Sequence, residues 1–437
     1  MSQQTATRPG PPPPPGAEAA AHAGPAPDPR GRGGLLGPLT RGSTPAALGR
    51  LRVASAVAVL VATVVSAVVL VVGWDANRAA AADTEQLIRA QAIKTDLLRA
   101  DALATNAFLV GGLESATQRS AYDDALTSVT EGITAASEAQ PADQVVLARL
   151  NAAVLAYAST MELARANNRQ GLPVGGAYLR QASGELRSTA LPLTDALVAA
   201  NAERAESAMD GQHPWLLVLP AALAVALLFL VNRWIAARFR RHVNVGLAVA
   251  ALVVLGAGVV AVAAAGTRAG DNAVVRGGSY AVVVDGAAAR TAANDAKSDE
   301  SLRLIARGSG QAFEDAWTAA AAEVDDALVV AGNPAVRAQW QAYVDGHAQV
   351  VELDAGGSWD DAVELATTTG SDGTTAVFTE FDTAMAQVVS DAADSATGSL
   401  RGGTWLLLAA AGLWVALGLL ATGAAWRGVS VRMGEYS

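Results

Sequence analysis

Four stretches of the chain are almost wholly apolar, and each is long enough to be considered as a membrane span. A transmembrane helix needs about 20 apolar residues to cross roughly 30 Å of hydrocarbon. Tryptophans, whose rings favour the membrane surface, mark the ends of these stretches. The predicted transmembrane helices are residues 53–73, 215–231, 243–266 and 404–425.

The first long segment between them, residues 75–213, has the apolar period of an α-helix. Apolar positions recur at steps of three and four, as in Tyr157, Met161 and Ala164. Such a stripe is typical of helices packed in an antiparallel bundle. Gly and Pro interrupt it at 111–112, 140–141 and 171–173. We therefore predict four helices, of which the first and last continue into the spans, with a kink at Pro192.

Residues 268–402 repeat this plan, with stripes through Trp317 and through Trp340, Tyr343 and His347. Breaks are predicted at 332–334, 356–357 and 367–375. The two halves also share a local pattern, which ends at Glu114 in the first and at Gly310 in the second. We predict an all-α membrane protein with four transmembrane helices and two extracytoplasmic helical bundles, formed by tandem duplication of a span-bundle-span unit.

The charges predict how the chain is oriented. Only 16% of residues are charged, and arginines gather just before the first span, between the second and third, and after the fourth. Basic residues mark cytoplasmic segments, so both bundles are expected outside the cell membrane. The Pro/Gly/Ala-rich start of the chain cannot form a core and is predicted to be disordered. The predicted cytoplasmic parts are residues 1–45, 232–242 and 426–437.

Composition disfavours several classes of function. The chain has no cysteine, and its four histidines lack metal-ligand spacing, so no metal, cofactor or catalytic residue is predicted and the protein is not expected to be an enzyme. Acidic residues outnumber basic ones in both bundles, which disfavours nucleic acid as a partner. The spans lack ionisable residues, which disfavours transport. The class of function that these observations leave is signal transmission across the membrane. The sequence does not decide whether the protein forms a homo-oligomer.

Two turns at the far ends of the first bundle helices, Val110 to Glu114 and Arg307 to Gly310, are candidates for docking a partner, because tip loops carry function more often than helix cores. Plain helix ends would also place glycines there. His347 falls on a core stripe and is expected to be an interior histidine that could respond to pH. The candidate partner-binding residues are Asn106, Phe108, Gly111, Gly112, Glu114, Lys297, Glu300, Arg307 and Gly310.

Short segments of the chain resemble an actinobacterial family of GlnX-like four-span membrane signalling proteins. The similar segments are Thr44 to Leu51, Thr105 to Glu114, Ala296 to Gly310 and Arg432 to Tyr436. The chain departs from the family pattern in its final residue, Ser437, and in its longer Pro-rich start. The resemblance implies that the bundles sense a periplasmic-type, glutamine-binding-type solute-binding lipoprotein and signal to a soluble cytoplasmic serine/threonine kinase.

We therefore expect a membrane protein that senses a lipoprotein loaded with an acidic amino acid or glutamine. Two alternatives stay open on the sequence. One is a chemoreceptor-like sensor that binds a small ligand directly in its helical bundle. The other is a structural or assembly factor without a ligand.

Overall fold

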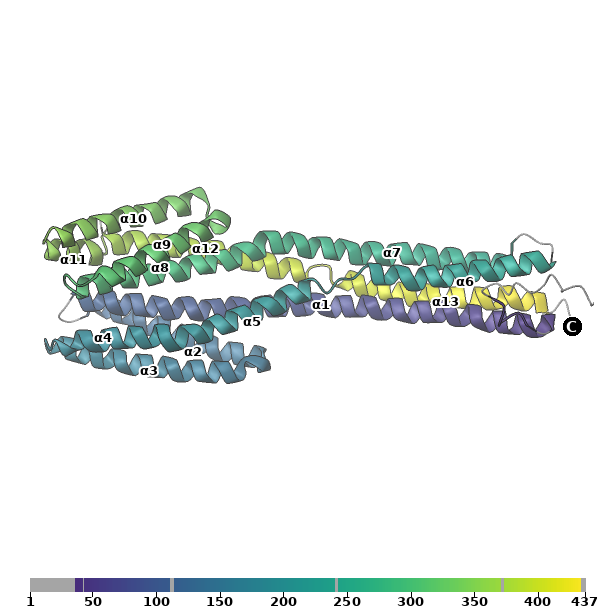
Figure 1. Ribbon diagram of the computed structural model, residues 1–437, viewed down its shortest axis with the longest axis horizontal. Coiled ribbons are helices and arrows are strands. Elements are labelled where there is room, and N and C mark those ends of the chain that lie inside the picture. Colours follow the sequence, from purple (N-terminus) through teal and green to yellow (C-terminus); the bar gives the residue numbers. More distant parts are fainter. Residues whose placement is uncertain (1–35, 42, 111–113, 240–242, 371–372, 434–437) are drawn as a thin grey trace, which may run out of the picture.

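The computed structural model describes residues 36–41, 43–110, 114–239, 243–370 and 373–433. Within these ranges the chain is almost entirely helical and forms no strand. Most helices run along one long axis (Figure 1). Two bundles lie at one end of the rod and four apolar helices lie at the other. Outside the described residues fall Gly111 and Gly112, most of the predicted disordered segment, and parts of the predicted cytoplasmic loop and tail.

The helices follow the predicted pattern of stripes and breaks. The first half contains α1 (Thr44–Val110), α2 (Ala116–Ala139), η1 (Pro141–Asp143), α3 (Gln144–Arg169), α4 (Val174–Glu185), η2 (Leu186–Ala190), α5 (Leu191–Met209) and α6 (Trp215–Phe239). The second contains α7 (Val245–Val275), η3 (Arg276–Tyr280), α8 (Ala281–Ile305), α9 (Gln311–Ala331), α10 (Pro334–Ala355), α11 (Trp359–Thr367), α12 (Thr374–Arg401) and α13 (Trp405–Met433). Among the described residues, the predicted breaks at 140–141, 171–173, 332–334, 356–357 and 367–375 each include a boundary between two of these helices.

Four helices, α1, α6, α7 and α13, are long and apolar enough to cross a membrane, as predicted. They enclose a shared core, while many other large apolar side chains on them are exposed, such as Val72, Leu252 and Leu420. An exposed apolar surface of this extent suits lipid rather than water. The helices also approach closely, since a Cβ on Gly246 would lie 2.5 Å from the Ala424 carbonyl oxygen.

Two of the four spans continue into the bundles. Helix α1 is a single helix of 67 residues, and α7 continues through η3 into α8 with a kink at Gly278, whose φ/ψ is not helical. By contrast, α5 ends at Met209 and α6 begins at Trp215, so the expectation that the last helix of the first bundle continues into its span was wrong. The intervening sequence contains Gly211 and ends at Pro214, which lacks the backbone N–H that an unbroken helix requires.

Pro192 also has a local effect on its helix. It lies in the first turn of α5, directly after the π-helical turn η2. A proline removes one backbone hydrogen bond and crowds the preceding turn, so a wider turn at this point is a common response. This turn matters for the site because it carries Arg187.

The two bundles pack against each other along α1 and α8. The first bundle consists of the later part of α1 with α2, α3 and α4 to α5, and the second of α8, α9, α10 and α12 with the short α11. Leu302 of α8 belongs to the apolar core of the first bundle. The hydroxyl oxygens of Thr95 and Thr291 lie 3.2 Å apart in the middle of this contact. The bundles therefore form one packed body.

Candidate functional site

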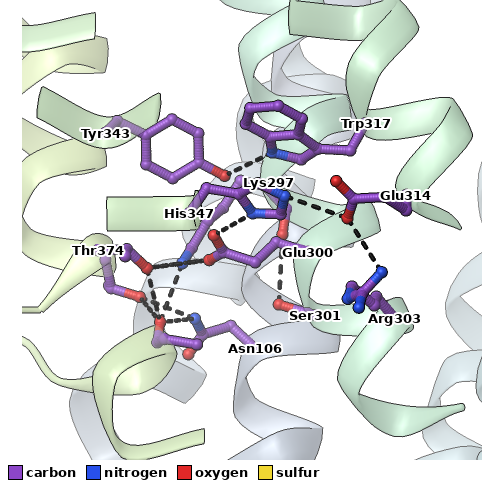
Figure 2. A network of polar contacts seen from close by, with 12 residues as sticks. Asn106, Lys297, Glu300, Ser301, Arg303, Glu314, Trp317, Tyr343, His347 and Thr374 are labelled. Carbon is purple, nitrogen blue, oxygen red and sulfur yellow. Dashed lines mark hydrogen bonds and ion pairs between the residues drawn. The ribbon is translucent and has the colours of Figure 1, made fainter. Parts of the chain in front are cut away.

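A buried set of charged side chains lies inside the second bundle (Figure 2). We call Lys297, Glu300, Glu314, His347 and Thr374 the Glu300 cluster. Lys297 and Glu300 stand one turn apart on α8, and their Nζ and Oε1 atoms are 2.6 Å apart. His347 of α10 contacts the other Glu300 oxygen through Nδ1 at 2.9 Å, and Thr374 at the start of α12 donates to Glu300 at 2.9 Å. Three helices, α8, α10 and α12, thus meet at one carboxylate, and Glu314 of α9 contacts the far side of His347.

Burial and pairing decide the charge state of this cluster. Glu300 is fully buried, and burial alone would raise the pKa of its carboxyl, but Lys297 and His347 lower that pKa to about 2. Burial also disfavours a protonated His347, yet its hydrogen bonds to Glu300 and Glu314 raise its pKa above the usual range. The ring of Trp317 stacks on His347 at 3.7 Å with an angle of 9° between the planes. Such stacking favours a cationic imidazole.

The first half of the chain reaches this cluster through the end of α1. The Asn106 side chain donates to the Thr375 hydroxyl at 2.9 Å and lies 3.5 Å from the Ala366 carbonyl oxygen. Lys297 donates to the same carbonyl at 2.9 Å. The end of α11 and the start of α12 therefore link Asn106 to the Glu300 cluster.

A second buried carboxylate, Asp101, joins the two bundles. Its oxygens accept hydrogen bonds from Ser183 at 2.7 Å and from Arg187 and Ser298 at 2.9 Å each. Ser298 belongs to α8, so one side chain of α1 holds both the first bundle and the second. A carboxylate that is fully buried must have such partners, because an unpaired one would cost several kcal/mol.

Arg187 extends this contact further into the second half. Its guanidinium also forms an ion pair with Asp295 and lies 3.8 Å from Asp299. Although burial would lower the pKa of Arg187, these carboxylates together with Asp101 raise it overall. The arginine is therefore a permanent cation shared by the two halves.

Of the predicted site residues, Asn106, Lys297 and Glu300 come together in the interior. Each is at least nine-tenths buried, so none of the three lies on a docking surface in this structure. Their proposed contact with a partner stays a prediction. Gly111 and Gly112 lie outside the described residues.

Phe108 and Glu114 line a cavity of about 190 Å³ at the far end of the first bundle. Glu114 pairs there with Arg165 at 3.3 Å. Three arginines, Arg119, Arg165 and Arg169, contribute to its walls. This end of the bundle is therefore a hollow with mixed charge.

Arg307 and Gly310 line a separate cavity of about 460 Å³ at the corresponding end of the second bundle. The Arg307 guanidinium lies 3.8 Å above the ring of Trp359, and its backbone φ of 39° is in the left-handed region. Arg307 is exposed while Gly310 is buried. Both predicted tip segments therefore border cavities.

Asp101, Arg187 and Glu314 are not among the site residues predicted from the sequence. A signal was present for Asp101, because it lies four residues after Leu97 on the apolar stripe of α1. A charged residue at a core position predicts a buried partner. Its identity depends on packing between distant segments, which one sequence does not supply.

The first bundle is similar to a known family. Residues 76–210 match the family model described as an actinobacterial sensor domain. This range runs from the part of α1 just beyond the span to the end of α5 and the residue after it. No curated protein and no solved structure matches the chain. The match supports a sensing role in an actinobacterial protein.

Proposed function

We propose that the protein is a transmembrane signal transducer whose bundles sense an extracytoplasmic state and relay it to the cytoplasm. The observation that carries this proposal is the continuity of α1 and of α7 through α8, which are bonded to each other at Asp101 and Ser298. A change in how the bundles pack would alter two helices that run on into the spans. Packed helices tend to shift between discrete arrangements, so they can transmit such a change over a long distance.

A tandem arrangement of two span-bundle-span units fits this role, and two contacts between the halves support it. Asn272 donates to Asn77 at 3.1 Å across a sequence separation of 195, and Thr95 meets Thr291 across a separation of 196. The π-helical turn η3 lies between Asn272 and Thr291 and accommodates one additional residue. Equivalent positions of two copies would meet in this way about a common axis.

We propose further that the tips dock a solute-binding lipoprotein specific for acidic amino acids or glutamine, and that the response reaches a cytoplasmic serine/threonine kinase. The exposed Arg307 and the cavities beside it and beside Glu114 support docking at the tips. The arginines that flank the spans support the orientation with the bundles outside. The partner identities rest on the family resemblance.

Photo-cross-linking in native membranes tests this docking. A photoreactive residue at position 112 or at the exposed Ser309 should capture an amino-acid-binding lipoprotein, and glutamate or glutamine should change the yield. The same residue at Ala135, on an exposed face of α2, serves as a control. If the yield of cross-linked lipoprotein from the tip positions equalled that from Ala135, docking at the tips would be contradicted.

The cavity at Arg119, Arg165 and Arg169 favours a second candidate function, direct binding of a small anionic ligand in the first bundle. Arg165 is buried and already pairs with Glu114, whereas the described residues hold no ion-pair partner of Arg169. Calorimetry on the full chain in lipid nanodiscs would decide, with glutamate as the probe. Micromolar binding that is lost in Arg169→Gln favours this candidate, and absence of heat removes it.

A further inference from the structure

A cavity of about 500 Å³ lies between the two bundles and is separate from the cavities that Glu114 and Arg307 line. Residues of α4 and η2 line one side and residues of α8 and α9 line the other. Its volume falls within the range of about 300–1,000 Å³ that is usual for small-molecule sites. Any occupant would contact both halves of the chain at once.

One carboxylate in this cavity lacks a close partner. Asp299 is only 4% exposed, and among the described residues it accepts no hydrogen bond, its nearest basic group being Arg187 at 3.8 Å. Arg187 itself is committed to Asp101 and Asp295, which approach it more closely. Glu323 adds another acidic group to the wall. The carboxylates around Arg187 therefore outnumber the cations.

The remaining wall is apolar. Leu302 is buried and Phe313 half-buried, and both also pack with the core of the first bundle. The exposed alanines Ala312, Ala316 and Ala319 of α9 leave this side wide, because they fill little space. The cavity thus combines an acidic end with an apolar, aromatic side.

We propose that this cavity binds a small molecule whose primary ammonium group meets Asp299 and whose apolar body lies against Phe313 and Leu302. An ammonium group supplies the hydrogen bonds and the positive charge that the buried carboxylate lacks. The protonation behaviour of Asp299 agrees with this arrangement. Burial raises the pKa of Asp299 to about 7 although Arg187 lowers it, so the carboxyl is poised to lose its proton when a cation arrives.

Two kinds of molecule carry this chemistry: a free amine and an apolar α-amino acid. Arg180 distinguishes them, because it lines the cavity, is exposed, and has no ion-pair partner among the described residues. A ligand carboxylate would meet Arg180, whereas an amine would not need it. This ligand site is independent of lipoprotein docking at the tips, so either proposal can fail without the other.

Titration calorimetry on the full chain in lipid nanodiscs tests the proposal, with 2-phenylethylamine and L-phenylalanine as probes and empty nanodiscs as the blank. At least one probe should bind with micromolar to millimolar affinity and release protons near neutral pH. Asp299→Asn should weaken that binding at least tenfold. Arg180→Gln should weaken L-phenylalanine alone. Asp326→Asn, an exposed carboxylate change on α9, should leave binding unchanged.

A second variant allows the proposal to be tested even if Asp299→Asn alters folding. Ala316→Leu fills the cavity from its exposed wall and keeps every charge, so it should abolish binding while the protein stays folded. Absence of binding by both probes to the wild type would overturn the proposal. So would binding that persists in the folded Asp299→Asn and Ala316→Leu variants.

Discussion

At the scale of single residues, the interior of the bundles is held by ion pairs that differ from those on the surface. Lys297 and Glu300 are almost fully shielded from water, whereas Lys94 and Asp195 form a close pair that stays partly exposed. Removing one member of a buried pair leaves an uncompensated charge in a medium of low dielectric. Water and salt compensate the charge at an exposed pair.

We therefore expect Lys297→Met to destabilise the protein by about 3–5 kcal/mol. Lys94→Met, the same substitution at the exposed pair, should cost about 0–1 kcal/mol. Thermal and denaturant unfolding of both variants in detergent, followed by circular dichroism, measures the difference. Equal losses of unfolding free energy in the two variants would show that burial does not increase the contribution of the Lys297–Glu300 pair to stability.

His347 should make the stability of the second bundle depend on pH. Its folded pKa is raised above the unfolded value, so its contribution is complete below about pH 6.5 and is lost as pH rises through the folded pKa. Glu300 acts in the opposite direction, because its pKa is lowered to about 2 and its contribution is lost only as pH falls below about 4.5. The cluster is therefore strongest between these limits.

The unfolding temperature of the wild type should fall between about pH 6 and about pH 9 by more than that of His347→Gln. The glutamine keeps hydrogen-bonding capacity but does not titrate in this range, so the difference between the two curves isolates the imidazole. Parallel curves would mean that folding does not raise the pKa of His347.

At the scale of helices, the π-helical turn η3, which is kinked at Gly278, allows α7 to α8 to match α1 despite an additional residue. Asn272 contacts Asn77, and Thr291 contacts Thr95. The turn η3 lies between Asn272 and Thr291 in the second half of the chain. Because the extra residue is confined to η3, the flanking faces keep their direction. An α-helix with a deleted residue instead rotates everything beyond it by about 100°.

Deleting Gly278 from η3 should therefore convert the π turn into an α turn and leave the assembly folded. Deleting the exposed Ala79 from α1, between Asn77 and Thr95, should destroy the packing of both bundles. Protease sensitivity and unfolding temperature of the two purified variants provide the comparison. A Gly278 deletion as damaging as the Ala79 deletion would contradict this role of η3.

Much of the helical arrangement was predictable from local sequence. Apolar length predicted the spans, and Tyr157, Met161 and Trp340 of the predicted stripes are all in bundle cores. The break between α5 and α6 was missed because Gly211 and Pro214 follow an otherwise good helical pattern. The packing of α1 on α8, and hence the partners of Asp101, depends on contacts almost 200 positions apart. Periodicity carries no information about such pairs.

At the scale of the whole molecule, locking the two halves together should stop signalling. The chain has no cysteine, so Thr95→Cys with Thr291→Cys can form a single disulfide at the centre of the α1–α8 contact. In cells, cytoplasmic serine/threonine phosphorylation should then no longer change when glutamate or glutamine is added, and a reductant should restore the change. Thr95→Cys alone is the control, and an oxidised double variant that responds normally would contradict the relay.

The central claim is that the packing of the bundles is coupled to the far ends of the spans. Because the chain has no cysteine, pairs of introduced cysteines can carry nitroxide labels whose separation is measured. One pair, at Ala46 and Val245, reports on the ends of the spans, and the other, at Ala135 and Ala335, reports on the packing of the bundles; all four positions are exposed. Pulsed electron–electron double resonance in nanodiscs would measure the distance within each pair, in the wild type and in Asp101→Asn. This substitution weakens the hydrogen bonds that Ser183, Arg187 and Ser298 donate. We predict changed distance distributions for both pairs. A change across the bundles with an unaltered distance at the span end would contradict the account.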